Sequence, residues 1–194
     1  MFKSLDTLSF PFLMLTLEEQ KKALRKQVRE LKKAIPAVEK ELRSARLFEH
    51  LETLDVFREA STLMAYWAME DEVQTREFIL KWFTKKQIIL PSVDGDQLRL
   101  KVFTGLSQME AGESFGIPEP GGEDFLYPDT IRLVLVPGLA FDRDNHRMGR
   151  GKAFYDRLLP KLKAYKIGLA FSCQVFNSIP SGPDDIRMDL VLDC

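Results

Sequence analysis

The sequence is short of cysteine, of net charge and of long apolar runs, and each shortage excludes a class of protein. Two cysteines, Cys173 and Cys194, are too few for a disulfide framework in 194 residues. A formal net charge of -1 provides no overall attraction for nucleic acid. No apolar run approaches the length of a membrane-spanning helix. With 45% hydrophobic residues, the chain is expected to form a compact cytoplasmic protein with reduced thiols, a monomer that binds neither nucleic acid nor membrane.

The start of the chain also lacks the features of a secretory signal. The apolar residues 10–17 are few, and neither a basic region nor a small-residue cleavage site accompanies them. A helical pattern begins near Thr16, which leaves Met14 as an alternative start of the protein. We therefore expect residues 1–16 to be an extension that need not be ordered, and residues 17–194 to be a single domain.

Helical and strand patterns alternate along the remaining chain. Helices are predicted at residues 17–35, 36–54, 73–84 and 154–162, the second with Val38, Leu42, Leu47 and Leu51 facing inward. Short apolar or alternating runs predict strands at residues 62–67, 87–90, 98–103, 131–136, 166–171 and 188–192. Pro91 is expected to end the second of these strands. The alternation predicts an α/β domain with a mainly parallel sheet.

Residues 105–129 form a long segment that is rich in glycine and proline and has little periodicity. Loops of this length inside a domain are usually functional or disordered. Within the segment, residues 117–120 read Ile-Pro-Glu-Pro and are expected to be extended, because proline restricts the residue before it to extended conformations.

The stretch that begins at Ile131 combines an apolar strand, a glycine-rich loop and the start of a helix. The loop reads Met-Gly-Arg-Gly-Lys at residues 148–152. Glycines allow backbone N–H groups to approach an anion, and a helix N-terminus adds a positive field. Arg147, Arg150 and Lys152 contribute three mobile cations. The stretch therefore predicts a phosphate site.

This loop fits neither of the common nucleotide-binding patterns. A Walker A loop requires glycine where His146 stands and serine or threonine where Ala153 stands, and a dinucleotide fingerprint requires glycine at Phe154. A basic surface loop whose glycines serve turns remains an alternative. Asp156, one turn into the predicted helix, is a candidate ligand for the metal ion that accompanies a nucleotide.

Longer motifs around this loop resemble the 5-formyltetrahydrofolate cyclo-ligase family, also called methenyltetrahydrofolate synthetase. The matching residues are Val136-Pro137-Gly138-Leu139-Ala140-Phe141-Asp142, then Arg147-Met148-Gly149-Arg150-Gly151-Lys152, then Tyr155-Asp156. Supporting matches are Lys21-x-x-Leu24-Arg25, Glu72, Ile117-Pro118-Glu119-Pro120 and Asp185-x-x-x-Asp189. The chain departs from the family pattern at Phe115, Asn145-His146, Ala153 and Phe154. His146 is expected to be exposed to solvent, and Ala153 is expected to have a negative φ.

The resemblance implies a three-layer α/β fold and an enzyme that uses ATP and Mg²⁺. Such an enzyme converts 5-formyltetrahydrofolate, with or without a polyglutamate tail, to 5,10-methenyltetrahydrofolate, releasing ADP and phosphate. Phosphorylation of the formyl oxygen makes it a leaving group, and N10 of the folate then closes the ring. A non-catalytic module that binds a nucleotide or folate on the same fold is the alternative, and the changes at Ala153 and Phe154 motivate it.

The resemblance also implies site residues. The ATP site would comprise Lys21, Lys22, Arg25, Arg147, Met148, Gly149, Arg150, Gly151, Lys152, Ala153, Phe154 and Tyr155. Lys152 and Arg150 would be catalytic, with Lys152 stabilising charge on the transferring phosphoryl group. The folate site would comprise Trp67, Glu72, Phe115 and Tyr155. Asp156 and Asp185 would hold Mg²⁺, directly or through water.

Overall fold

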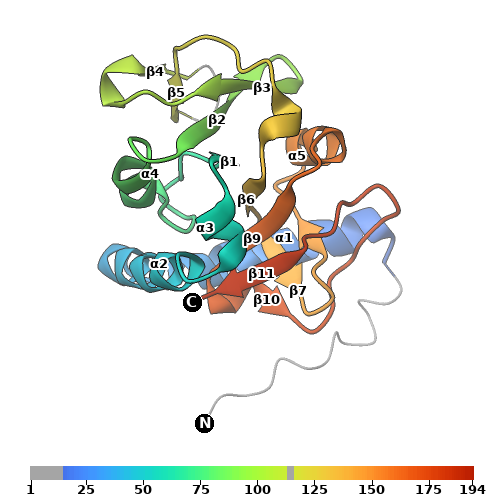
Figure 1. Ribbon diagram of the computed structural model, residues 1–194. Coiled ribbons are helices and arrows are strands. Elements are labelled where there is room, and N and C mark those ends of the chain that lie inside the picture. Colours follow the sequence, from blue (N-terminus) through green and yellow to red (C-terminus); the bar gives the residue numbers. More distant parts are fainter. Residues whose placement is uncertain (1–14, 113–115) are drawn as a thin grey trace.

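The computed structural model describes residues 15–112 and 116–194, which fold around a six-stranded sheet (Figure 1). The strands, in spatial order, are β11 (Leu190–Asp193), β9 (Tyr165–Ala170), β6 (Leu133–Pro137), β1 (Thr62–Met64), β2 (Gln87–Asp94) and β3 (Gln97–Val102). Neighbouring strands are parallel except for the antiparallel hairpin of β2 and β3. The predicted α/β fold with a mainly parallel sheet flanked by helices is confirmed.

The central strand β6 explains why the sheet is buried on both sides. Leu133, Val134, Leu135 and Val136 are all fully buried, so the strand is a continuous apolar run. Because side chains alternate along a strand, Leu133 and Leu135 contact the core on one face of the sheet, and Val134 and Val136 contact the core on the other. The two faces are covered by different elements.

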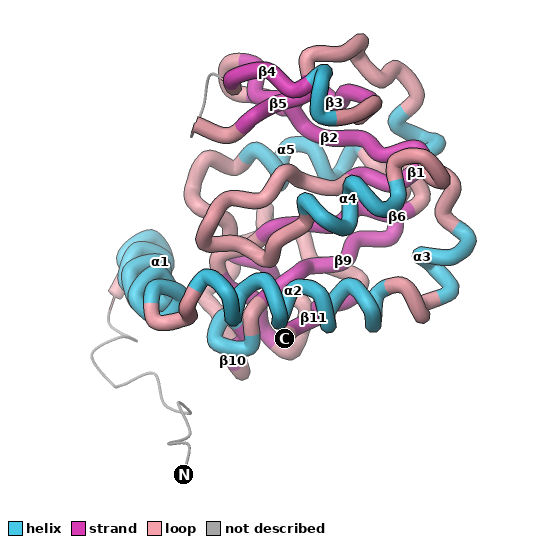
Figure 2. Tube along the Cα trace, turned by 90° about the vertical axis from the view of Figure 1, so that its left-hand side faces the viewer, coloured by secondary structure: helices cyan, strands magenta, loops and turns pink. Residues whose placement is uncertain are grey.

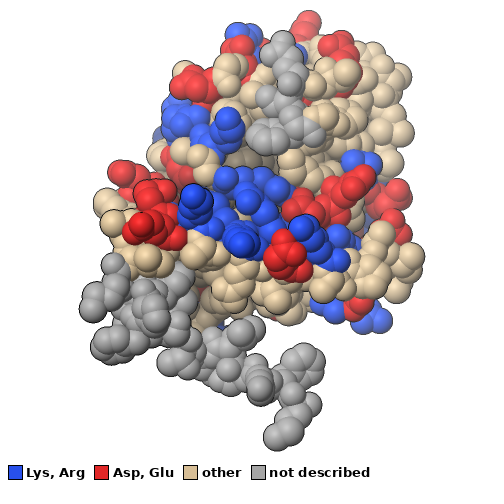
Figure 3. Space-filling view, turned by 180° about the vertical axis from the view of Figure 1, so that it is seen from behind, with Lys and Arg blue, Asp and Glu red and all other residues tan. Residues whose placement is uncertain are grey.

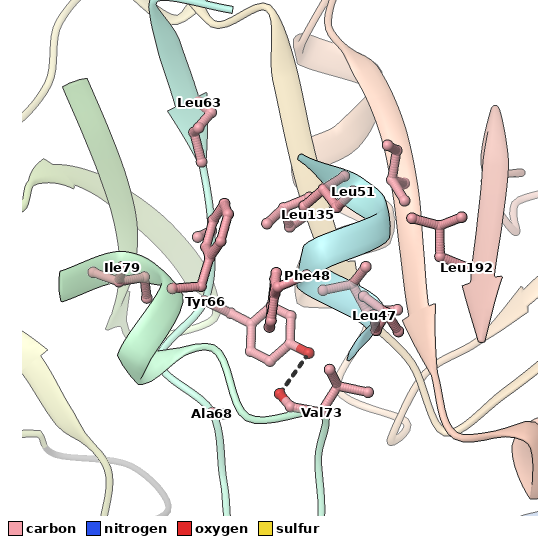
Figure 4. Close-up of a cluster of buried hydrophobic side chains, with 14 of the residues drawn as sticks. Leu47, Phe48, Leu51, Leu63, Tyr66, Ala68, Val73, Ile79, Leu135 and Leu192 are labelled. Carbon is pink, nitrogen blue, oxygen red and sulfur yellow. Dashed lines mark hydrogen bonds between the residues drawn. The ribbon is translucent and has the colours of Figure 1, made fainter. Parts of the chain in front are cut away.

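Three helices cover the first face: α2 (Ala37–Leu51), α3 (Asp55–Glu59) and α4 (Arg76–Trp82). Figure 4 shows Leu47, Phe48 and Leu51 of α2 pointing toward the side chains of Leu135 and Leu192. The hydroxyl of Tyr66 donates a hydrogen bond to the Val73 carbonyl at 3.1 Å, which satisfies this buried polar group beside α4 (Figure 4). This layer is the larger of the two cores.

The second face is covered by α5 (Phe154–Leu158), by the 3₁₀ helix Leu159–Lys161 and by a small sheet. The small sheet contains β10 (Val175–Phe176), β7 (Ala140–Asp142) and β8 (Arg147–Met148) in that order. The helix α1 (Leu17–Lys33) packs on it through Leu24 and Val28. Figure 2 shows α2 lying along the main sheet and α1 to one side of it. The layers are therefore helices, sheet, and a mixed layer of helix and small sheet.

The helix α1 begins at Leu17, as predicted, and its N-terminus is capped. Thr16 accepts a hydrogen bond from the Glu19 N–H through its hydroxyl, and the Glu19 carboxylate accepts one from the Thr16 N–H, which is a capping box. The second predicted helix begins after Pro36, as expected, but the prediction of its inward-facing residues was partly wrong. Val38 is 68% exposed and Leu42 is 58% exposed. Leu42 lies nine residues before the buried Leu51, which is two and a half turns at 3.6 residues per turn. The two side chains therefore point to opposite sides of the helix.

Pro91 does not end its strand, contrary to the prediction, because β2 continues beyond it in the hairpin with β3. The N–H of Ala65 donates to the Ile89 carbonyl, so the backbone N–H and C=O of Ile89 point toward β1. Because these directions alternate from one residue to the next along a strand, the backbone nitrogen of Pro91 also points to the β1 side. Register with β1 ends at Ile89. The missing N–H of Pro91 therefore lies beyond the last paired residue of β1 and costs no ladder hydrogen bond.

Other elements differ from the prediction mainly in length. The helix expected at 73–84 is α4 (Arg76–Trp82), and the one expected at 154–162 shortens to α5 followed by a 3₁₀ turn at Pro160. The segment 105–129 contains 3₁₀ turns at Leu106–Gln108 and Pro128–Thr130 and a hairpin of β4 (Met109–Ala111) and β5 (Pro118–Pro120). The extended conformation predicted for 117–120 is confirmed for Pro118–Pro120. A further 3₁₀ turn, Ser172–Gln174, and β10 follow β9.

Among the described residues, no helix is long and apolar enough to cross a membrane.

Candidate active site

A cleft opens beyond the carboxyl ends of β1 and β6, the edge of a parallel sheet where ligands commonly bind. It encloses about 920 Å³, its open mouth included. Its walls come from five parts of the chain: the segment after β1, the β2–β3 hairpin, the segment 117–119, the end of β6, and the loop that runs into α5. The lining residues are Tyr66, Trp67, Met69, Glu72, Pro91, Val93, Leu98, Ile117, Pro118, Glu119, Pro137, Gly138, Arg147, Gly149, Arg150, Lys152, Ala153, Phe154, Tyr155 and Asp156.

The backbone of the glycine-rich loop takes two left-handed residues before α5. Gly151 has φ +105°, which glycine adopts freely, and Ala153 has φ +54°. The expected negative φ at Ala153 is therefore wrong. Ala153 is the residue at which the chain turns from the loop into the helix, and its carbonyl accepts the N–H of Arg157 at 3.1 Å. The turn imposes this conformation, and nothing in an alanine side chain signals it.

Arg147 was predicted to be a mobile cation, and that prediction is wrong. Its side chain is buried, with 3% exposed, and its Nη2 donates to Asp156 Oδ1 at 2.7 Å. Its Nη1 donates to the Pro137 carbonyl at 3.1 Å, and the guanidinium lies over the Tyr155 ring. Arg147 therefore ties the end of β6 to the first turn of α5. The neighbouring Met148 is buried against α1, and its carbonyl accepts the Leu139 N–H.

Arg150 lies between two acids that follow β1. Its Nη2 is 2.5 Å from Asp71 Oδ1 and 3.1 Å from Glu72 Oε1, and its Nε is 3.3 Å from the same Glu72 oxygen. Desolvation lowers the pKa of Arg150, but Glu72 and Asp71 outweigh it, so the pKa lies above its usual value. Glu72 Oε2 also accepts the Met69 N–H at 3.1 Å. The pairing joins the loop before α5 to the segment after β1.

The first helix contributes two cations that contact two different loops. Lys21 is buried, and its Nζ is 2.7 Å from Asp185 Oδ2, which also accepts the Gly182 N–H. Arg25 Nε donates to the Gly149 carbonyl at 3.2 Å. Lys21 and Arg25 therefore do not form a solvated face, whereas Lys22 on the same helix is exposed. Figure 3 shows basic side chains gathered at the centre of one face, with acidic side chains on both sides.

The other predicted site residues lie at the cleft or outside the described residues. Lys152 is exposed and lines the cleft, as do the half-buried Phe154 and Tyr155. Burial raises the pKa of the Tyr155 hydroxyl well above its usual value, so this group stays neutral. The Trp67 ring packs on Phe103, and its buried Nε1 has no hydrogen-bond partner among the described residues. Phe115 lies outside the described residues.

Comparison with known proteins decides the family. The family model of the 5-formyltetrahydrofolate cyclo-ligase family matches residues 17–193. The chain belongs to this family. The 5-formyltetrahydrofolate cyclo-ligase of Mus musculus is 28% identical over 193 residues, which cover 91% of this chain and 95% of the mouse protein. The 5,10-methenyltetrahydrofolate synthetase of Aquifex aeolicus has a similar structure, with a TM-score of 0.81, 32% identity and 89% of each chain covered. A synthetase from Mycoplasma pneumoniae superposes with a TM-score of 0.70 and 26% identity, over 89% of this chain and 97% of the other.

Within the cyclo-ligase fold, the two predicted metal ligands lie in different surroundings. Asp156 lines the cleft with its side chain 21% exposed, and Arg147 is bonded to Oδ1 only. Asp185 is not part of the cleft lining and is bonded to Lys21 and Gly182. Among residues 15–112 and 116–194, no three His, Cys, Asp or Glu side chains form a metal-binding group. Mg²⁺ commonly takes one or two carboxylates and completes its shell with phosphates and water, so Asp156 fits such an ion.

The structural role of Asp142, which lies in the cyclo-ligase motif, was not predicted from the sequence. This fully buried carboxylate accepts the N–H groups of Asp144 and His146 at Oδ1 and that of Ile179 at Oδ2. His146 Nδ1 lies 3.0 Å from Asp142 Oδ2, and the His146 side chain is only 18% exposed, so the expectation that it is solvent-exposed is wrong. Sequence reasoning also missed Asp71, although it stands next to the predicted Glu72.

Proposed function

We propose that this protein converts 5-formyltetrahydrofolate to 5,10-methenyltetrahydrofolate, with ATP as the phosphoryl donor. The observation that carries this proposal is that Gly149, Arg150, Lys152 and Ala153 of the glycine-rich loop line one cleft together with the carboxylate Glu72. Arg25 holds this loop from outside the cleft lining, through the Gly149 carbonyl. The family match over nearly the whole chain supports the same reaction. A cleft with an anion-binding side and an apolar side suits one substrate with a triphosphate and another with a pterin.

The chemistry requires positioning and charge stabilisation rather than a protein nucleophile. Transfer of the γ-phosphoryl group of ATP to the formyl oxygen turns that oxygen into a leaving group. Lys152 and Arg150 supply positive charge beside the transferring group, and Gly149, which lines the cleft without a side chain, allows close approach. The walls of the cleft hold the two substrates together, which removes the entropy cost of a bimolecular encounter.

The apolar side of the cleft suits the folate. Tyr66, Trp67, Pro91 and Val93 provide flat and apolar walls. Glu72 can accept hydrogen bonds from the N–H groups of the pterin. Phe115 remains our prediction for a stacking side chain above the pterin. These roles extend the family assignment to individual residues of this chain.

Asp156 is proposed to hold Mg²⁺ together with the phosphates, and Asp185 to reach the ion directly or through water. An Mg²⁺ ion held there would supply positive charge to the phosphates of ATP. Arg147 holds Asp156 in place through one oxygen, and no hydrogen bond among the described residues uses the other oxygen. Lys21 orients Asp185 in the same manner. The two carboxylates are thus positioned by cations before a metal ion arrives.

Replacing Asp156 by asparagine tests this metal role. We expect Asp156→Asn to raise the Mg²⁺ concentration for half-maximal activity by about tenfold, because a hard cation prefers a charged oxygen ligand. Binding of folate should change much less. The readout is a Mg²⁺ titration of activity, together with electron paramagnetic resonance of Mn²⁺ bound to the ATP-loaded protein. An unchanged titration with full activity would remove Asp156 from the metal site.

A simple assay separates catalysis from binding alone. The absorbance of the methenyl product should rise when the protein is mixed with ATP, Mg²⁺ and 5-formyltetrahydrofolate, and it should stay flat when ATP is left out. If substrates bind but no product forms, the protein is a non-catalytic binding module on this fold. Substrates with and without a polyglutamate tail, compared in the same assay, show which form the cleft prefers.

The organisation of the protein is part of the proposal. We propose one domain over residues 17–194, acting as a monomer in a reducing compartment such as the cytoplasm. Cys173 and Cys194 are both free, and burial raises the pKa of each thiol, which keeps the reactive thiolate scarce. Analytical ultracentrifugation with and without ATP tests the oligomeric state.

A further inference from the structure

A buried lysine at the end of α1 is connected to the cleft through a chain of ion pairs. Lys32 has a side chain only 1% exposed, and its Nζ lies 2.7 Å from Asp71 Oδ2. The other oxygen of Asp71 lies 2.5 Å from Arg150 Nη2, and Arg150 in turn contacts Glu72. Lys32 and Asp71 do not line the cleft, whereas Arg150 and Glu72 do. The ion pairs therefore connect Lys32 in the interior to Arg150 and Glu72 in the wall of the cleft.

This arrangement is costly unless the charges have a use. Taking an ammonium group out of water is expensive, and an apolar side chain of similar size is often the more stable choice in such a position. Burial lowers the pKa of Lys32, and the contact with Asp71 opposes this effect. Burial alone would raise the pKa of Asp71, but Lys32 and Arg150 outweigh it and hold the pKa below its usual value. Asp71 therefore remains an anion at neutral pH.

The two acids leave one edge of the Arg150 guanidinium open. Asp71 and Glu72 take hydrogen bonds from Nη2 and Nε. Within the described residues, no hydrogen bond uses Nη1. Because the guanidinium is planar, fixing two of its nitrogens also fixes the direction in which Nη1 can donate. An oxygen of an anionic ligand in the cleft is a suitable acceptor for that group.

We propose that Asp71 is a positioning residue, held in place by Lys32, that orients Arg150 so that Nη1 meets the transferring phosphoryl group. This inference rests on the proposed function, and it assigns Asp71 and Lys32 a role through Arg150 rather than through contact with substrate. Glu72 alone cannot fix the guanidinium as well, because it takes Nε and Nη2 with the same oxygen, at 3.3 and 3.1 Å. Asp71 supplies the shorter contact, and Lys32 restrains Asp71 from its other side.

Asp71→Ala tests the role, with Glu70→Ala as its matched control. Glu70 is the adjacent acid and is exposed. We expect Asp71→Ala to lower kcat about tenfold, because a misdirected guanidinium stabilises the transition state less well than an aligned one. The KM for ATP should change by less than about threefold, because other cations of the site also bind the triphosphate in the ground state. Glu70→Ala should leave both constants unchanged.

A second pair of variants separates positioning from stability. Asp71→Ala also leaves the Lys32 ammonium buried without its partner, which should lower Tm. Combining it with Lys32→Met removes both charges, so Tm should recover while kcat stays low. Lys33→Met is the control for the lysine, because Lys33 is the neighbouring residue with a side chain 72% exposed. Lys32→Met alone should also lower kcat. The fold-reduction in the double variant should be smaller than the product of the two single fold-reductions, because both residues act through Arg150.

The outcomes separate the inference from the function on which it rests. If the wild-type protein forms product and Asp71→Ala retains kcat within twofold, the positioning role is wrong and the proposed function stands. Recovery of kcat together with Tm in the double variant would show that the ion pairs serve stability alone, and would also overturn the inference. If the wild-type protein forms no methenyl product, the proposed function fails, and the positioning role fails with it.

Discussion

At the scale of single residues, Ala153 carries backbone strain at the cleft. Its φ of +54° lies in the left-handed region, which costs an L-residue roughly 1 kcal/mol and glycine almost nothing. The strain occurs where the loop that lines the cleft enters α5. The protein therefore tolerates a methyl group at a position where its backbone favours glycine.

Ala153→Gly should for this reason stabilise the protein. We expect a gain of about 0.5 kcal/mol in the free energy of unfolding, and a Tm higher by roughly 1–2 °C, because the relief of strain exceeds the added freedom of the unfolded chain. The affinity for ATP should be equal or better. Differential scanning calorimetry and calorimetric titration with ATP measure both.

A control for Ala153→Gly is available on α1. Ala23 is exposed in the middle of this helix, so Ala23→Gly should lower stability by about 1 kcal/mol. Opposite signs for the two substitutions would establish the left-handed backbone at Ala153 in solution. A Tm that falls for both would contradict it.

Lys152 is the residue whose loss should affect turnover most with least effect on folding. It is exposed at the cleft, and no hydrogen bond from its ammonium group to another described residue would be lost. Lys152→Ala should lower kcat by about 10²–10³-fold or more, as expected when a group that stabilises transition-state charge is removed, with Tm unchanged. Lys161→Ala, at an exposed lysine outside the cleft, is the control. Near-normal kcat at saturating ATP would exclude Lys152 from the mechanism.

At the scale of elements, the loop between β7 and β8 depends on one buried carboxylate. Asp142 accepts three backbone N–H groups, two from its own loop and one from Ile179, and contacts the His146 ring. The loop leads directly into Arg147 and the glycine-rich segment. A single side chain therefore holds the geometry from which the candidate site is built.

Asp142→Asn should destabilise the protein strongly. The amide that replaces one carboxylate oxygen must face an N–H donor, so a buried donor loses its acceptor. We expect a loss of about 2–3 kcal/mol in the free energy of unfolding, measured by urea titration. Asp144→Asn, at an exposed acid of the same loop, should change stability by less than about 0.5 kcal/mol. If Asp142→Asn lowered the free energy of unfolding no more than Asp144→Asn, the hydrogen bonds to the Asp142 carboxylate would not be needed for stability.

At the scale of the whole molecule, α1 contacts segments beside the cleft that are far from it in sequence. Its Lys21 and Arg25 contact Asp185 and the Gly149 carbonyl, and its Lys32 contacts Asp71. The first helix packs on the small sheet through Leu24 and Val28, and this packing places its three cations. Binding of ATP is therefore expected to be coupled to docking of α1.

Two truncated proteins test this dependence. A chain that begins at Met14 keeps the capping box of α1 and should retain the Tm and kcat of the full chain, as expected if the domain begins near residue 17. A chain that begins at Lys26 lacks Lys21, Leu24 and Arg25 and should lose activity and ATP binding. Full activity of the shorter chain would show that α1 is dispensable for the site.

The sequence by itself determined the features that depend on local chemistry. Apolar runs specified the buried strands, the pair Thr16 and Glu19 specified the start of α1, and the motif around residues 148–152 specified the loop and the family. These signals lie within a few residues of the structure that they encode, so patterns of burial, capping and spacing are sufficient to predict them.

Only the tertiary structure decided how distant side chains are paired and which surfaces are covered. Arg150 meets Asp71 across 79 positions, and Lys21 meets Asp185 across 164. The left-handed φ of Ala153 follows from the turn between the loop and α5, and the exposure of Val38 and Leu42 follows from which side of α2 contacts the sheet. No local pattern contains this information, because an ion pair or a buried face depends on the residues that the fold brings opposite it.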